Sequence, residues 1–271
     1  MRKSPIQQAG LRQAGFALVV VLWTVAILAL LVTSVTVGAG RESRLTTTLR
    51  DQAIGRAAAD GVVSSVIMEY LRAGAALPGM RRFGGLPVSV ALEDLSGRIN
   101  PNVVPAPMLM ALLVQLGVAP QAAENLAAAI VDWRSPGLRP SPHGAKAAEY
   151  RAAGRAYGPL GRPFESLDEL GDVLGMNPVL LAALKPHLTL WTSSDPDPAY
   201  ADALVLVALR ASGAPPFGAR GTEARVMAIR AAAHLHEGEV ATRRAVIRFG
   251  FSPDGRAWRI LEWDDGDAGN E

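Results

Sequence analysis

An uncharged run near the N-terminus, Phe16–Val37, reads FALVVVLWTVAILALLVTSVTV and extends for 22 residues. As a helix that rises ~1.5 Å per residue it would measure about 33 Å, the thickness of the hydrocarbon core of a membrane. The preceding residues 1–15 carry three basic side chains and no acid. Because basic flanks stay on the cytoplasmic side, we predict one transmembrane segment over residues 16–38, with the N-terminus in the cytoplasm and the C-terminal part in the periplasm.

The composition excludes several classes of protein. The chain of 271 residues is 49% hydrophobic and 19% charged, where soluble domains average about 25% charged, and its mean hydropathy is +0.19. The absence of cysteine excludes disulfides, thiolate metal sites and a cysteine nucleophile. The formal net charge is +2, and without residues 1–15 the remaining 24 basic residues face 25 acidic ones, which predicts no strong attraction for nucleic acid. No G-x-S-x-G, P-loop or H-E-x-x-H motif occurs, so we do not expect an enzyme.

The helix is predicted to continue beyond the apolar run. No proline occurs between residues 6 and 77, and after residue 44 apolar side chains recur at helical spacing with charged ones between them. We therefore predict one helix from about Phe16 to about Ala73, half transmembrane and half amphipathic. The sequence Leu77-Pro78-Gly79 would end it, and the alternating run Pro87–Glu93 would follow as a strand. Residues 39–95 would then hold a helix and a first strand.

Residues 96–192 show helical spacing and an internal repeat. Leu116-Gly117-Val118-Ala119-Pro120 and Leu174-Gly175-Met176-Asn177-Pro178, each with a leucine six residues later, fit L-G-h-x-P-x5-L. A glycine at the end of one helix and a proline at the start of the next predict helix–turn–helix units. After a linker, residues 193–271 contain four runs that predict strands: Ala203–Leu209, Ala224–Ile229, Ala245–Phe251 and Trp258–Trp263.

Three interpretations of the N-terminal segment are open at this point. The apolar run is longer than the roughly 7–15 residues of a cleaved secretion signal, although Val37-Gly38-Ala39 is an acceptable cleavage site. An uncleaved signal anchor is the second interpretation. The third follows from the order of a basic leader, Gly15, Phe16 and the apolar run, which resembles the prepilin leader of type IV pilins and type II secretion pseudopilins. That resemblance implies cleavage after Gly15 by prepilin peptidase and N-methylation of Phe16.

Further motifs resemble one pseudopilin family in particular. After cleavage Val20 would be the fifth residue, where most relatives carry Glu and K-type pseudopilins characteristically do not. Ile99-Asn100-Pro101-Asn102 and Ile130-Val131-Asp132-Trp133-Arg134 resemble an L/I-N-x-N start and an I-x-D-W-R end, and Pro163–Leu170 and Leu184–Thr189 resemble the second half of the same domain. By these motifs the chain is identified as a member of the type II secretion minor pseudopilin K family (general secretion pathway protein K).

The resemblance implies a fold of class α+β. It implies a leader peptide at residues 1–15, a long N-terminal transmembrane and amphipathic helix, and a small antiparallel pilin-like sheet. A large all-helical domain would be inserted at residues 96–192, and residues 193–271 would return the chain to the sheet.

The resemblance also implies a role and partners. The chain would be a non-enzymatic subunit of the bacterial inner membrane, placed at the tip of the type II secretion pseudopilus. There it would support protein secretion across the outer membrane and limit filament growth. Its partners would be I- and J-type minor pseudopilins, prepilin peptidase and the inner-membrane secretion platform.

Calcium is the one cofactor that the resemblance raises. Family members usually carry acidic residues after the D-W-R motif and after a Gly-Ala pair, and these are associated with calcium. Here the positions read Ser135-Pro136-Gly137 and Lys146-Ala147-Ala148. Asp132 and Glu149 remain as calcium candidates, although a hard cation takes six to eight oxygens, several of them from carboxylates.

Two other functions fit part of the sequence. A signal-anchored periplasmic binding protein would explain the membrane segment and the helical hairpins. A nucleic-acid-binding pseudopilin would use the L-G-h-x-P turns as helix-hairpin-helix units, which hold phosphate through backbone amides. Few basic residues flank these turns, so nucleic acid is not expected as a partner.

Overall fold

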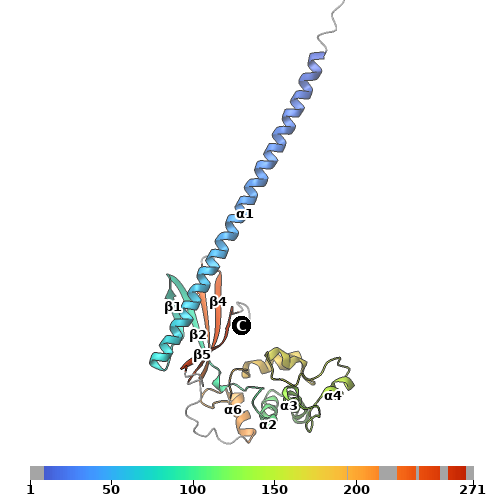
Figure 1. Cartoon of the computed structure of the whole chain (residues 1–271), viewed down its shortest axis with the longest axis vertical. Helices are drawn as coiled ribbons and strands as arrows, with labels where there is room; N and C mark the ends of the chain where they lie inside the picture. Colours follow the sequence, from blue (N-terminus) through green and yellow to red (C-terminus); the bar gives the residue numbers. More distant parts are fainter. Residues whose placement is uncertain (1–8, 194, 214–224, 236–237, 251–255, 267–271) are drawn as a thin grey trace, which may run out of the picture.

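A single helix of 65 residues, α1 (Ala9–Ala73), leads the chain and extends far beyond the rest of the fold (Figure 1). The structure is a computed structural model that describes residues 9–193, 195–213, 225–235, 238–250 and 256–266; within α1 it describes the side chains of residues 19–30 and from residue 48 onward. The predicted end of the helix near Ala73 is confirmed. The helix begins at Ala9, seven residues before the predicted start, because the predicted start was placed at the first residue of the apolar run.

The sheet is an antiparallel meander of five strands, in the order β1-β2-β3-β4-β5. The strand predicted at Pro87–Glu93 is confirmed as β2, and three of the four predicted C-terminal runs coincide largely with β3, β4 and β5. Ala224 and Phe251, at the ends of two of these runs, lie outside the described residues. The sequence analysis missed β1, which pairs with β2. The strands are β1 (Gly79–Phe83), β2 (Leu86–Asp94), β3 (Arg225–His234), β4 (Val240–Phe249) and β5 (Trp258–Asp264).

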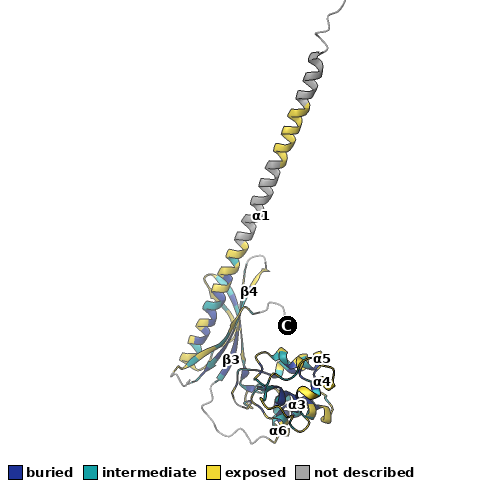
Figure 2. Cartoon of the chain, turned by 45° about the vertical axis from the view of Figure 1, so that its right-hand side comes forward, coloured by how far each residue is buried: buried dark blue, intermediate teal, exposed yellow. Residues whose placement is uncertain are grey.

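The C-terminal part of α1 packs on one face of this sheet, and its inward side is buried (Figure 2). Val62, Val63 and Val66 are fully or almost fully buried there, against strand residues such as Ile229 and Ile247. The helix carries a glycine at residue 61 because a Cβ there would lie 2.3 Å from the Phe83 ring of β1. A glycine inside a helix costs about 1 kcal/mol relative to alanine, and here it permits close contact between helix and strand.

A helical domain is inserted between β2 and β3 and has a hydrophobic core of its own. The chain is therefore of class α+β, as predicted, with the helical part at the end of the sheet away from the start of α1 (Figure 1). Its helices are η2 (Leu95–Gly97), α2 (Ala106–Gln115), α3 (Pro120–Arg134), α4 (Ala147–Ala152), η3 (Leu167–Asp172), α5 (Pro178–Leu184), η4 (Lys185–His187) and α6 (Ala203–Ala211).

The strand predicted at Ala203–Leu209 is wrong, because these residues form α6. The Asp202 carboxylate accepts hydrogen bonds from the amides of Leu204 and Val205 and so caps the helix. Val205 and Ala208, three residues apart, are fully buried in the core of the helical domain. A short apolar run does not by itself separate strand from helix. Helical structure packed on the domain core therefore continues beyond the predicted boundary at residue 192.

The two L-G-h-x-P units fold as helix connections, as predicted. Gly117 and Gly175 have φ of 85° and 95°, and Pro120 and Pro178 are the first residues of α3 and α5. The helix before the second turn, η3, is a 3-10 helix. The leucines that close the two motifs, Leu126 and Leu184, are buried in the domain core. Packing of this core therefore accounts for the repeat.

Gly97, at the junction of sheet and helical domain, is expected to tolerate no side chain. A Cβ there would lie 2.2 Å from the backbone carbonyl of Tyr200, and a backbone cannot turn aside as a side chain can. Gly97→Ala is expected to lower the free energy of unfolding by about 2–3 kcal/mol through overpacking. The matched control is Gly137→Ala, where a Cβ meets nothing within 4 Å, and it should change stability by less than about 0.5 kcal/mol. Equal effects in denaturant titrations of the two variants would contradict the close contact.

Candidate functional site

The N-terminal half of α1 presents apolar side chains outward. From Val19 to Leu30 the described side chains are exposed, Val20 at 45% and Trp23 at 65% among them. The same helix is buried against the sheet from Ala58 onward. One helix therefore joins a folded domain to an apolar segment that the chain itself does not cover.

Within the described part of the chain, no helix is long and apolar enough to cross a membrane. Residues 16–18 and 31–38 of the predicted transmembrane segment have side chains outside the description. Gly15 and Phe16, the predicted sites of cleavage and methylation, lie in the α1 backbone, and their side chains are likewise outside it. The predicted span, cleavage and methylation stay predictions.

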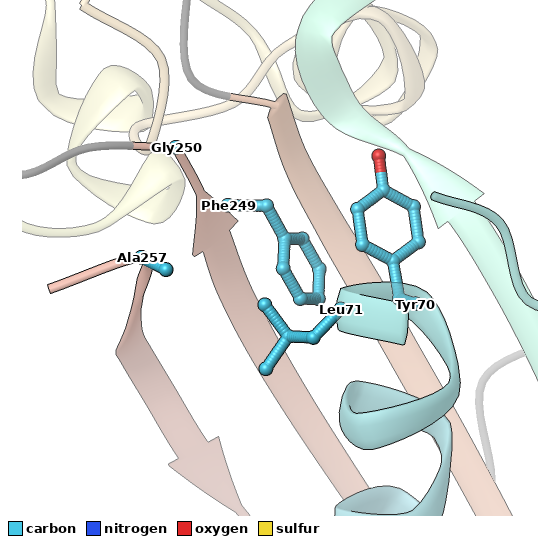
Figure 3. Close-up of a pocket in the computed structure, with 5 residues that line it drawn as sticks. All are labelled: Tyr70, Leu71, Phe249, Gly250 and Ala257. Carbon is cyan, nitrogen blue, oxygen red and sulfur yellow. The ribbon is translucent and has the colours of Figure 1, made fainter. Parts of the chain in front are cut away.

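A small pocket lies where α1 ends on the sheet (Figure 3). The rings of Tyr70 and Phe249 lie 4.1 Å apart, centroid to centroid, and Leu71, Gly250 and Ala257 complete the lining. The Tyr70 hydroxyl accepts a hydrogen bond from Arg225 Nη1 at 3.2 Å. None of the lining residues carries a charge, and the one side-chain polar group among them is the Tyr70 hydroxyl.

The asparagine side chains of the I-N-x-N motif join distant segments of the helical domain by hydrogen bonds. The Asn100 side chain is 3% exposed; its Nδ2 donates to the carbonyl oxygens of Leu190, at 3.2 Å, and Thr192, and its Oδ1 accepts from the amide of Asn102 at 2.8 Å. The Asn102 side chain in turn donates to the carbonyl of Phe164 and accepts from its amide, at 2.9 and 2.8 Å. The two asparagines therefore join the start of the domain to its middle and to its end.

The tryptophan of the D-W-R motif lies in an aromatic cluster at the centre of the domain. The Trp133 ring stacks on Phe164 at a centroid distance of 6.2 Å and lies beside Tyr150. The Tyr150 hydroxyl accepts from the amide of Leu174 at 2.9 Å, and burial raises the pKa of this hydroxyl to about 12. These residues fix the fold of the domain, and this hydroxyl stays protonated near neutral pH.

The calcium candidates Asp132 and Glu149 lie at the two ends of the loop that joins α3 to α4. Asp132 Oδ2 accepts from the amide of Ser141 at 2.9 Å. It also lies against Gly144, where a Cβ would come within 2.0 Å of it. Glu149 Oε2 accepts from the amide of Lys146 at 2.8 Å, at the first turn of α4. Both carboxylates are thus engaged by backbone amides.

The Lys146 ammonium lies among the carbonyl oxygens of this loop. Lys146 is 6% exposed, and its Nζ donates to the carbonyl of Asp132 and, at 2.6 Å, to that of Ser135. Between Asp132 and Glu149 the sequence holds no third acid. In the described part of the chain no group of three or more His, Asp or Glu side chains could hold a metal. The donors at this loop therefore do not fit a calcium ion, which takes six to eight oxygens.

Residues 90–193, from β2 to the segment after η4, match the family model described as type II secretion system (T2SS), protein K. Residues 90–193 therefore form a domain of the type II secretion protein K family. The identification made from the motifs is confirmed. The match includes Asn100, Asn102 and Trp133, so the family's domain is built here on the contacts described above.

A solved structure supports the protein K fold over most of the chain. A chain in the crystal structure of the GspK-GspI-GspJ complex from the enterotoxigenic Escherichia coli Type 2 Secretion System is 17% identical, with a TM-score of 0.63. The match covers 84% of this chain and 100% of that one. No curated protein sequence matches the chain. The family domain and the fold together support a minor pseudopilin of type II secretion.

Two functional features escaped sequence reasoning. The hydrogen bonds of Asn100 and Asn102 join residues 62 to 92 positions apart, so local periodicity carries no sign of them. Lys146 appeared in the sequence only as a departure from an acidic pattern. The sequence did not show that Lys146 is buried, because a single lysine in a glycine- and proline-rich loop gives no local signal of burial.

Proposed function

We propose that this chain caps the tip of the type II secretion pseudopilus and limits its growth while it supports secretion across the outer membrane. The observation that carries the proposal is the position of the helical domain, at the end of the sheet away from the start of α1 (Figure 1). Subunits of a helical filament join through their long helices. A domain of this size at the far end would block the position of a further subunit.

The exposed apolar half of α1 supports membrane anchoring and assembly in the same proposal. In the inner membrane, residues 16–38 would anchor the chain, and after extraction the same side chains would pack on the helices of neighbouring subunits. Val20 would be the fifth residue of the mature helix. In other subunits a carboxylate at that place neutralises the N-terminal ammonium of a neighbour. A tip subunit has no neighbour above it that needs this partner.

I- and J-type minor pseudopilins are the proposed partners at the tip. The similar chain of known structure comes from a complex named for K, I and J components. The exposed side chains of α1 and of the sheet edges offer surfaces for such contacts. Prepilin peptidase and the inner-membrane platform are proposed as the machinery that processes and extracts the chain.

A thiol label on the helical domain tests the position in the filament. The chain has no cysteine, so Leu138→Cys, at a residue that is 93% exposed, creates one unique site for maleimide–gold. In sheared pseudopili we expect gold at one end only, and no gold at the ends when the I- and J-type genes are deleted. Wild-type chain treated in the same way is the control for background labelling. Gold along the length, or no labelled filament at all, would contradict the proposal.

A further inference from the structure

The loop between α3 and α4 has a positive charge at the position where an acidic pattern would hold a metal. The carbonyl oxygens of the last turn of α3 lie at the negative end of the helix dipole, which attracts a cation. In this chain the cation at these oxygens is the ammonium group of the Lys146 side chain. The Lys146 Nζ donates to the carbonyls of Asp132 and Ser135, and the residue is 6% exposed.

We propose that the Lys146 ammonium is a built-in substitute for a metal ion, and that the helical domain folds without calcium. An ammonium has three donors and no acceptor, so it can join several carbonyl oxygens as a small cation does. By joining Asp132 of α3 and Ser135, the residue that follows the helix, to the residue before α4, it closes the loop from both ends. The two carboxylates of the loop each already accept a hydrogen bond from a backbone amide, and two acids supply too few of the oxygens that calcium takes.

A divalent ion at the same oxygens would face a strong penalty. It would lie beside a buried ammonium, and like charges at such distances repel strongly where water is excluded. Its coordination by Asp132 and Glu149 would also compete with the hydrogen bonds that these carboxylates accept from the amides of Ser141 and Lys146. The loop is therefore complete with its own lysine.

Calcium dependence of the wild-type chain is the first test. The full chain in detergent is unfolded thermally with excess calcium chloride or with EDTA, and calcium alone is titrated into it by calorimetry. We expect one unfolding midpoint under all conditions and no heat of binding. A midpoint raised by calcium or lowered by EDTA would overturn the proposal, and these readouts involve no partner subunit and no secretion.

The second test removes the charge. Lys146→Met keeps most of the side-chain length but removes a donor from the carbonyls of Asp132 and Ser135, of which Asp132 keeps its bond from the Ser135 amide. We expect the midpoint to fall by about 5–10 °C with no rescue by calcium. Lys185→Met is the matched control, because Lys185 is more exposed and pairs with Asp168 at the surface. A much smaller change is expected there. Equal shifts for the two variants, or rescue of Lys146→Met by calcium, would overturn the role of Lys146.

Discussion

Gly15→Leu is expected to leave the chain unprocessed and to abolish secretion by the type II system that depends on it. The wild-type chain, expressed with prepilin peptidase, is expected to yield a product that starts at Phe16 and carries one added methyl group. The physical reason is the position of Gly15 in the sequence. Gly15 lies at the junction between a basic leader and the apolar run, on the cytoplasmic edge of the predicted membrane segment, where a branched side chain would obstruct a peptidase that requires glycine.

The control is the same substitution, glycine to leucine, at another position in the leader. Gly10→Leu alters leader bulk equally but lies five residues before the cleavage bond, and it should be processed as the wild type is. Intact mass of the purified chain, with and without peptidase, gives the result directly. A product that starts at Gly40 whether or not the peptidase is present would indicate an ordinary secretion signal, and a chain that keeps Met1 would indicate an anchor. Either result would contradict the prepilin leader.

The sequence predicted most of the fold because its strongest signals are local. The lack of proline between Pro5 and Pro78, the spacing of apolar residues and the Leu77-Pro78-Gly79 stop are sufficient to predict where α1 ends. The glycine–proline pairs at 117–120 and 175–178 locate two helix connections. The resemblance to family motifs predicted that helices are inserted between β2 and β3. No local pattern shows that two strands 130 residues apart pair, as Leu92 and Ile229 do.

The parts that could not be predicted depend on contacts between distant residues. The run at 203–209 is apolar enough for a strand, and its helical state is fixed by the Asp202 cap and by burial on α2. β1 is short and carries two arginines, and it is held by pairing with β2 along its whole length. The state of Lys146 follows from the fold of a loop around it, which composition does not reveal.

Among substitutions that keep the shape of a side chain, Asn100→Asp is expected to be one of the most destabilising in the helical domain. The Asn100 Nδ2 group donates to the carbonyls of Leu190 and Thr192, and a carboxylate would place a charge against two acceptors instead. Loss of both donors and burial of an unpaired charge should lower the free energy of unfolding by about 3–5 kcal/mol. Asn125→Asp, on the exposed face of α3, is the matched control, with a change of less than about 0.5 kcal/mol expected.

The pH dependence of this loss in unfolding free energy distinguishes an effect of the introduced charge from an effect of side-chain shape. Burial among carbonyls raises the pKa of the introduced carboxyl above its unfolded value of about 3.9. The charge penalty is therefore complete above the raised pKa. It shrinks as the pH falls through that value, and it is lost below about 3.9, where the carboxyl is protonated in both states. Denaturant titrations of the full chain at several pH values should show Asn100→Asp approaching the wild type at acidic pH. A loss that is constant with pH would show that the asparagine acts through its shape alone, and a loss no larger than that of Asn125→Asp would show that the domain does not depend on this junction.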